Sequence, residues 1–240
     1  MRLSNSHSFE LKPNESIDYF LDGRLKIIQS KYGYRFSIDA VFISEFVTPR
    51  KGDIVVDLGT GCGVILLLLL LRHKLSCAIG IEIQKELAFQ AHRNAILNGF
   101  QDKMHIIIGD IRRLPFISGF ADVVVCNPPY RKIGSGRINP DPTKAIARHE
   151  LLISLNDILS TSKRLLKKKG RLALIYPAER VCEVMVKLNK CGFEPKRIQI
   201  AYPDLYSRAS LVLIEAYIGA KPGMTIEPPI IGQGNYAIPS

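Results

Sequence analysis

The stretch Val56-Asp57-Leu58-Gly59-Thr60-Gly61-Cys62-Gly63 decides the fold, because a β-branched run enters it and the apolar run Val64–Leu71 follows it. A glycine-rich turn between a strand and a helix lets the backbone approach a ligand closely, with helix amides nearby. The dinucleotide pattern GxGxxG is excluded, since its third glycine would fall on Val64 or Leu66. No GK[ST] follows, which excludes a P-loop. The remaining pattern, DxGxGxG, predicts a ligand site at a strand–helix turn.

Beyond this turn, short β-branched runs alternate with helical stretches, which is typical of βαβ units and a mostly parallel sheet. We expect strands at Ile54–Asp57, Cys77–Glu82, Met104–Gly109, Asp122–Cys126, Arg171–Tyr176, Arg197–Ala201 and Ser210–Tyr217. We expect helices at Val64–His73, Lys85–Asn98, Leu151–Leu166 and Glu179–Lys190, the last three followed by C-cap glycines at Gly99, Gly170 and Gly192.

Two segments lie outside this alternation. Asp22-Gly23 stands between two apolar runs and predicts a β-hairpin, with which the extended segment Tyr32–Phe36 could pair. We therefore expect residues 1–48 to form a hairpin lid with a lead-in helix, and residues 49–240 to form the main domain. The second segment, residues 131–149, is a connection rich in Gly, Pro, Arg and Lys, and loops of that length are usually functional or mobile.

The composition is that of a globular protein with a basic surface. The chain of 240 residues has 33 Lys and Arg against 22 Asp and Glu, a formal charge of +11, which favours nucleic acid, an anionic membrane or an acidic protein as a partner. The longest apolar run has eight residues, whereas a membrane helix needs roughly 20, so we expect no membrane partner. The five cysteines lack CxxC spacing and the histidines are scattered, which predicts reduced, buried thiols, a cytoplasmic location and no metal site.

The DxGxGxG turn resembles motif I of the class I S-adenosylmethionine (SAM) methyltransferases. That family has an acidic residue after the second strand, which binds the ribose hydroxyls, and another after the third strand, near the adenine amino group. Glu82 and Asp110 match these positions. A carboxylate at one strand end is common in α/β folds, but three at successive strand ends with the glycine loop favour a cofactor site. The resemblance implies SAM as cofactor, bound by Asp57, Gly59, Gly61, Gly63, Glu82, Ile83, Asp110 and Ile111.

The fourth expected strand leads into the tetrapeptide Asn127-Pro128-Pro129-Tyr130, at the sheet edge where ligands bind. The Asn127 side-chain carbonyl and the Pro128 main-chain carbonyl can accept the hydrogens of a planar amino group and stabilise the positive charge that develops during its methylation. The prolines fix the backbone, and Tyr130 offers a face for base stacking. The alternative is a structural Pro-Pro turn with a tyrosine packed beneath it.

This tetrapeptide resembles motif IV of amino-group methyltransferases, which act on adenine or cytosine amino groups or on a glutamine amide of release factors. The resemblance implies that Asn127, Pro128, Pro129 and Tyr130 are catalytic, with Asn127 also beside the cofactor.

A closer resemblance, to the bacterial tRNA(Val) adenine-N(6) methyltransferases, extends along most of the chain. It is carried by Phe36–Ile43, Asn127–Tyr130, Gly136–Pro140, Ala147–Glu150, Tyr176–Arg180 and Glu227–Pro229. It implies a Rossmann-like class I methyltransferase fold, α/β, with a seven-stranded mostly parallel sheet, an antiparallel edge made by its last two strands, and an N-terminal β-hairpin. The implied substrate is an adenine beside the anticodon of a tRNA, and the implied role of Asp39 is at the methionine end of the cofactor.

The basic residues point to RNA, although two other functions remain open. We expect Arg131, Lys132, Arg137, Lys144 and Arg148 to contact phosphates. The lysines at 167–169 are interpreted as a solvated helix end. The first alternative is a protein glutamine N5-methyltransferase acting on release factors, which usually has a helical N-terminal domain where this chain has a hairpin. The second is a non-catalytic RNA-binding module. Tyr206-Ser207-Arg208 has no role in any of these interpretations.

Overall fold

The computed structural model describes residues 11–32, 36–114, 118–128 and 153–232. Its strands are β1 (Glu15–Phe20), β2 (Leu25–Ser30), β3 (Ile54–Leu58), β4 (Cys77–Glu82), β5 (Met104–Ile108), β6 (Ala121–Cys126), β7 (Leu166–Pro177), β8 (Phe193–Tyr202), β9 (Leu211–Ile218), β10 (Thr225–Ile226) and β11 (Ile230–Ile231). Its helices are α1 (Ile38–Phe46), α2 (Val64–Arg72), α3 (Lys85–Leu97), α5 (Leu155–Leu165) and α6 (Val181–Lys190), with 3-10 turns η1 (Ile111–Arg113) and η2 (Ala178–Arg180).

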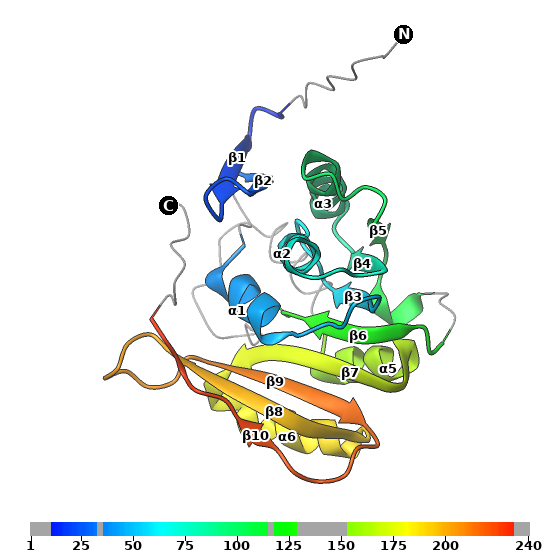
Figure 1. Ribbon diagram of the computed structural model, residues 1–240, viewed down its shortest axis with the longest axis vertical. Coiled ribbons are helices and arrows are strands. Elements are labelled where there is room, and N and C mark those ends of the chain that lie inside the picture. The colour runs from blue at the N-terminus through cyan, green and yellow to red at the C-terminus, as the bar shows by residue number, and fades with distance from the viewer. Residues whose placement is uncertain (1–10, 33–35, 115–117, 129–152, 233–240) are drawn as a thin grey trace, which may run out of the picture.

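The main sheet has the order β10-β8-β9-β7-β6-β3-β4-β5 within these residues, and β11 also pairs with β8 (Figure 1). Strands β3 to β7 pair in parallel, whereas β9 is antiparallel to both of its neighbours. The mostly parallel α/β fold with an N-terminal hairpin is therefore confirmed. The antiparallel pairing of the last two expected strands is confirmed in β8 and β9. The expected seven strands are nine within the described residues, because the short strands β10 and β11 also pair along the outer side of β8.

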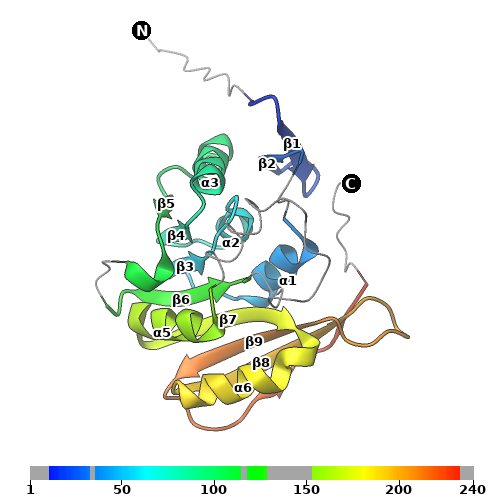
Figure 2. The ribbon, with the colours of Figure 1, turned by 180° about the vertical axis from the view of Figure 1, so that it is seen from behind.

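Strand residues alternate between two cores, one on each face of the sheet. Val55 and Val123 pack with α1, α2 and α3, while Val56 and Val124 pack with α5 and α6. Figures 1 and 2 show these two layers of helices on opposite faces. Because both faces are covered, β3 and β6 are buried almost throughout, as expected for central parallel strands.

The chain between α5 and β7 differs from the sequence prediction. Helix α5 begins at Leu155, after a capping box between Ser154 and Asp157, and ends at Leu165. Strand β7 starts directly afterwards, so the predicted helix cap at Gly170 is wrong and that glycine lies inside the strand. Residues 167–169 are exposed as predicted, but on a strand and not on a helix end. Lys167 pairs with Asp122 at 2.7 Å. The C-cap positions of Gly99 and Gly192 are confirmed by their positive φ angles after α3 and α6.

The hairpin predicted from Asp22-Gly23 is confirmed as β1 paired antiparallel with β2. Leu21, Asp22 and Gly23 all have positive φ in its turn. Tyr32 and Phe36 belong to no strand, and the residues between them lie outside the described part of the chain. Phe36 instead packs edge-on against Phe20, with ring centroids 5.9 Å apart.

Two asparagines, Asn94 of α3 and the C-cap residue Asn98 that follows it, attach the hairpin to the main domain. Asn94 is buried, accepts a hydrogen bond from the Ile28 amide at 2.6 Å and donates to the Ile28 carbonyl at 3.0 Å. Asn98 pairs in the same way with the amide and carbonyl of Lys26. Asn94 also donates to the carbonyl of Cys62, at 2.9 Å. A side-chain amide thus completes the edge of β2 and joins it to the glycine-rich turn.

We expect Asn94→Ala to lower the free energy of unfolding by about 1–3 kcal/mol, because buried backbone groups of Ile28 and Cys62 lose their hydrogen-bond partner. Urea denaturation measures this loss. The matched control is Asn98→Ala, whose partners on Lys26 are exposed to water and can be hydrated. An Asn94→Ala effect no larger than that of Asn98→Ala would contradict this role.

Candidate functional site

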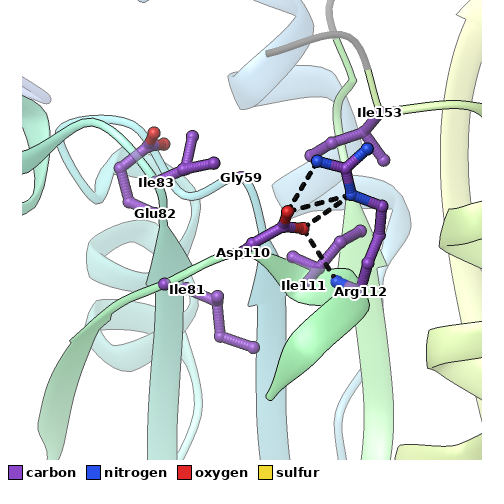
Figure 3. A pocket seen from close by; sticks show the side chains of 9 residues that line it. Gly59, Ile81, Glu82, Ile83, Asp110, Ile111, Arg112 and Ile153 are labelled. Atoms are coloured by element: carbon purple, nitrogen blue, oxygen red, sulfur yellow. Dashed lines mark hydrogen bonds and ion pairs between the residues drawn. The ribbon is translucent and has the colours of Figure 1, made fainter. Parts of the chain in front are cut away.

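A cleft lies at the carboxyl ends of β3, β4 and β5, where parallel α/β sheets bind ligands. The cleft is open to solvent, and the empty space among its lining residues is about 300 Å³ when that open solvent is included. Figure 3 shows its lining, in which Glu82 and Asp110 belong to neighbouring strand ends. The lining residues are Gly59, Ile81, Glu82, Ile83, Gly109, Asp110, Ile111, Arg112 and Ile153. The structure therefore brings together Gly59, Glu82, Ile83, Asp110 and Ile111, five of the residues expected at the cofactor site.

The glycine-rich turn is held open by its backbone conformation and by Glu82. Gly59, Gly61 and Gly63 have φ of +78°, +58° and +87°, values that L side chains rarely adopt. The buried Glu82 carboxylate accepts hydrogen bonds from the amides of Gly61 and Gln84, both at 2.9 Å. Glu82 thus fixes the loop after β3 and the loop after its own strand at the same time.

Two glycines of the turn serve different purposes. A Cβ on Gly59 would meet nothing within 4 Å, and Gly59 lines the cleft, so a ligand can approach its backbone. A Cβ on Gly63 would lie 2.5 Å from the Met104 methyl and 3.2 Å from the Ala91 Cβ. Gly63 is therefore required for close packing of α2 against its neighbours, whereas Gly59 is required for access.

Asp57 is fully buried beneath the turn. Its Oδ2 accepts a hydrogen bond from the Thr60 hydroxyl at 2.7 Å, and its Oδ1 has no hydrogen-bond partner among the described residues. Burial raises the pKa of Asp57 to about 7; the Thr60 hydrogen bond lowers it and the negative charge of Glu82 raises it. Asp57 therefore exchanges a proton near neutral pH, whereas an ordinary aspartate is fully ionised there.

Asp110 follows β5 and caps η1. Its carboxylate accepts hydrogen bonds from the Arg112 amide and from Nε and Nη2 of the same residue, the shortest at 2.6 Å. The dashed lines in Figure 3 show this arrangement. The hydrogen bonds from the Arg112 side chain hold the pKa of Asp110 below its usual value. An ionised carboxylate has about four acceptor sites, so the three N–H groups of Arg112 occupy most of the acceptor capacity of Asp110.

The amino-group motif begins directly after β6. Asn127 is half-buried and Pro128 is buried. The preceding Cys126 thiol donates to the Leu58 carbonyl at 3.1 Å, which ties the end of β6 to the start of the glycine-rich turn. Pro129, Tyr130 and the five basic residues expected to contact phosphates, Arg131, Lys132, Arg137, Lys144 and Arg148, lie outside the described residues.

The structure also shows the positions of Asp39 and of the five cysteines. Asp39 is half-buried in the first turn of α1, and burial raises its pKa while a hydrogen bond with Ser37 lowers it. All five cysteines are free, and the expectation that they are buried is confirmed for Cys62 and Cys126, whereas Cys77 and Cys191 are half-buried and Cys182 is exposed. In the part of the chain that the structure describes, no group of three His, Cys, Asp or Glu side chains could hold a metal ion, and no helix is long and apolar enough to cross a membrane.

Sequence reasoning missed Arg112, Asn94 and Thr60. A signal existed for Asn94, since it lies on the buried stripe of α3 with Leu87, Ala91 and Ala95, where a polar side chain requires a partner. Arg112 gave no such signal, because a basic residue in an exposed turn is ordinary.

We expect Asp57→Asn to change how stability depends on pH. Because the native pKa of Asp57 lies above its ordinary value, the native state holds this proton more tightly, and the wild type loses stability as pH rises from about 4 to about 7. The difference in unfolding free energy, Asp57→Asn minus wild type, should therefore increase between pH 5 and pH 8. We expect an increase of at least about 1.4 kcal/mol, the equivalent of one pKa unit. Urea denaturation at the two pH values measures this, with the exposed carboxylate variant Asp102→Asn as control. Parallel pH profiles for Asp57→Asn and the wild type would refute it.

Comparison with known proteins adds to this geometry. A family model described as "Methyltransferase domain" matches residues 49–209. The tRNA1(Val) (adenine(37)-N6)-methyltransferase of Porphyromonas gingivalis strain W83 is 38% identical over 172 residues, which cover 68% of this chain and 67% of that protein. The enzyme of the same name from Aeromonas salmonicida is 29% identical over 151 residues, 61% of each chain. The matched part thus spans about three fifths to two thirds of these relatives.

Solved structures show the same fold. A predicted O-methyltransferase from Agrobacterium tumefaciens has a TM-score of 0.64 at 21% identity, covering 80% of this chain and 86% of that one. A geranyl diphosphate methyltransferase in complex with SAM has a TM-score of 0.54 at 15% identity, covering 74% and 83%. With the family match over residues 49–209 and the identity to the Porphyromonas enzyme, the chain belongs to the methyltransferases, in the tRNA1(Val) (adenine(37)-N6)-methyltransferase family.

Proposed function

We propose that this protein transfers a methyl group from SAM to the exocyclic amino group, N6, of an adenine near the anticodon of a tRNA. The observation that carries the proposal is the adjacency of two features at one sheet edge. The cleft lies at the ends of β3, β4 and β5, and Asn127-Pro128 follows β6, the strand paired with β3 on its other side. A cofactor in the cleft and an amino group at Asn127 would therefore be neighbours.

The residues of the cleft fit SAM, which supplies a methyl group bound to a positively charged sulfur. The open space at the Gly59 Cβ position leaves room for a ligand against the backbone. Glu82 would accept hydrogen bonds from the ribose hydroxyls, and Asp110 would receive the adenine amino group beside the Ile111 backbone. Asp57, Gly61 and Gly63 would support the turn, with Ile83 against the adenosine part. We place Asp39 at the methionine end from the family resemblance.

Asn127 and Pro128 would provide the chemistry at the acceptor. An amino group conjugated to a purine ring is a poor nucleophile, and its nitrogen becomes positive as it attacks the methyl group. The Asn127 side-chain oxygen and the Pro128 carbonyl would accept its two hydrogens and stabilise that charge. No strong base is needed, because the nitrogen becomes acidic only after the transfer. Pro129 and Tyr130 would complete this catalytic motif.

The substrate would be an RNA loop, because an adenine must leave its stack to reach a cleft at the sheet edge, and unpaired loops allow this at less cost than a duplex. The formal charge of +11 supports binding to phosphates. Arg131, Lys132, Arg137, Lys144 and Arg148 would contribute to this binding. An enzyme acting on tRNA in bacteria would work in the cytoplasm.

The test is transfer of labelled methyl from SAM to total tRNA from cells that lack this protein, followed by nucleoside analysis. We expect label in N(6)-methyladenosine. Asn127→Ala should lower kcat by about 10²–10³-fold, the effect of removing one preorganised polar group from a transition state, and should leave the SAM dissociation constant nearly unchanged. A fully active Asn127→Ala variant would overturn the mechanism. Label in a purified release factor and none in tRNA would overturn the substrate.

Arg112 should compete with the cofactor for Asp110. Because the Arg112 side chain occupies acceptor sites on both oxygens of that carboxylate, the adenine amino group has full access to it only when the guanidinium withdraws. We expect Arg112→Ala to tighten SAM binding about three- to tenfold, the effect of one ordinary hydrogen bond. Calorimetric titration measures this, with Arg113→Ala, the exposed neighbouring arginine, as control. Weaker binding by Arg112→Ala would mean that Arg112 contacts the cofactor itself.

A further inference from the structure

The turn between β8 and β9 presents large apolar side chains to solvent. Tyr206 is 98% exposed and Leu205 is 75% exposed, and the basic residue Arg208 beside them is also exposed. An aromatic ring and an apolar side chain that are both exposed to water favour contact with a partner, because binding would remove their apolar surface from water. None of these residues contributes to the cleft.

The turn is held in a defined conformation by Asp204. The Asp204 carboxylate accepts hydrogen bonds from the amides of Tyr206 and Ser207, both at 2.8 Å, and from the Ser207 hydroxyl at 2.5 Å. These bonds hold the pKa of Asp204 below its usual value, so it stays ionised and occupied within the turn. Tyr206 is therefore presented on an ordered backbone, which reduces the entropy lost when a partner binds.

The turn leaves the sheet at the same edge as the acceptor site. Cys126, the last residue of β6, is level with Leu174 on β7. Three residues further along β7, Pro177 is level with Leu211 on β9, which in turn pairs with Ala201 at the end of β8. Three steps between neighbouring strands amount to roughly 14 Å across the sheet, and three residues along β7 add roughly 10 Å in the strand direction. Figures 1 and 2 show the β8–β9 connection projecting beyond this edge.

We propose that Tyr206 and Arg208 bind the tRNA substrate outside the catalytic cleft, with Tyr206 stacked on an unpaired base and Arg208 paired with a neighbouring phosphate. This proposal rests on the proposed function and adds to it the surface that recognises the RNA. An RNA occupant is favoured because an exposed tyrosine next to an arginine matches the stacking and charge pairing by which single-stranded RNA is bound. The positive charge of the whole chain acts in the same direction. An OB fold that binds a single strand contacts about 4–16 nucleotides, and an RNA segment of that length is enough to reach from the acceptor site to the turn.

The test measures binding of an unmodified tRNA(Val) transcript directly, without turnover. Tyr206→Ala should weaken binding by about 5- to 100-fold, the effect of losing one base stack, while Tyr206→Phe should bind like the wild type because it keeps the ring. Arg208→Gln should reduce the slope of log Kd against log salt concentration by about 1. The matched control is Tyr19→Ala, another exposed tyrosine, which lies on the hairpin that α3 carries at the β5 side of the sheet. The SAM dissociation constant should not change in any of these variants.

Each outcome separates this proposal from the function on which it rests. If the wild type methylates tRNA and Tyr206→Ala binds the transcript as tightly as Tyr19→Ala, the turn is not an RNA contact and only this inference is overturned. Loss of affinity in Tyr206→Phe as large as in Tyr206→Ala would overturn base stacking. If the wild type neither binds nor methylates tRNA, the proposed function itself fails. Unchanged RNA affinity with binding of a protein through Tyr206 would assign the turn to a protein partner and overturn the inference.

Discussion

The Glu82 carboxylate is the contact on which the site depends. The glycine-rich turn needs three left-handed residues in a row of five, and such a backbone has few intrinsic constraints. The Glu82 carboxylate accepts hydrogen bonds from the amides of Gly61 and Gln84. These bonds constrain the backbone of the turn and join the ends of β3 and β4. Its negative charge acts on the nearby Asp57, which burial already favours in the protonated form. The structure thus places two acidic groups close together, and the raised pKa of the buried Asp57 reduces their mutual repulsion.

The opposite side of the turn is fixed by packing. Met104 and Ala91 leave no room for a side chain at Gly63, and Asn94 binds the carbonyl of Cys62. Because Asn94 also pairs with Ile28, the N-terminal hairpin is part of the support of the cleft and not a separate appendage. A second contact strengthens this attachment, since the buried Glu15 of β1 pairs with Arg93 of α3 at 2.7 Å. Changes in the hairpin should therefore reach the turn through α3.

The central part of the fold and of the site could be predicted, because few structures are compatible with this part of the sequence. Buried parallel strands are continuous apolar runs, so the carboxylates that follow them fall at one edge, as Glu82 and Asp110 do. The polar run at 167–169 followed by Gly170 resembled a helix end, whereas pairing of Leu166 with Ala121 makes it a strand. The periodicity of a sequence does not show which side chains contact each other, so the contact between Arg112 and Asp110 is visible only in the structure. The short strands beside β8 have only two residues each and no pattern to detect.

The two surfaces to which we assign chemistry and RNA recognition differ in how tightly their residues are packed. The turn beneath the cleft is buried and sterically fixed, so a change at Gly63 or Glu82 disturbs the backbone on which the proposed reaction depends. Tyr206, by contrast, has almost its whole surface in water, and its replacement removes little native packing. An exposed turn at the edge of a rigid sheet can therefore vary with the substrate at small cost in stability.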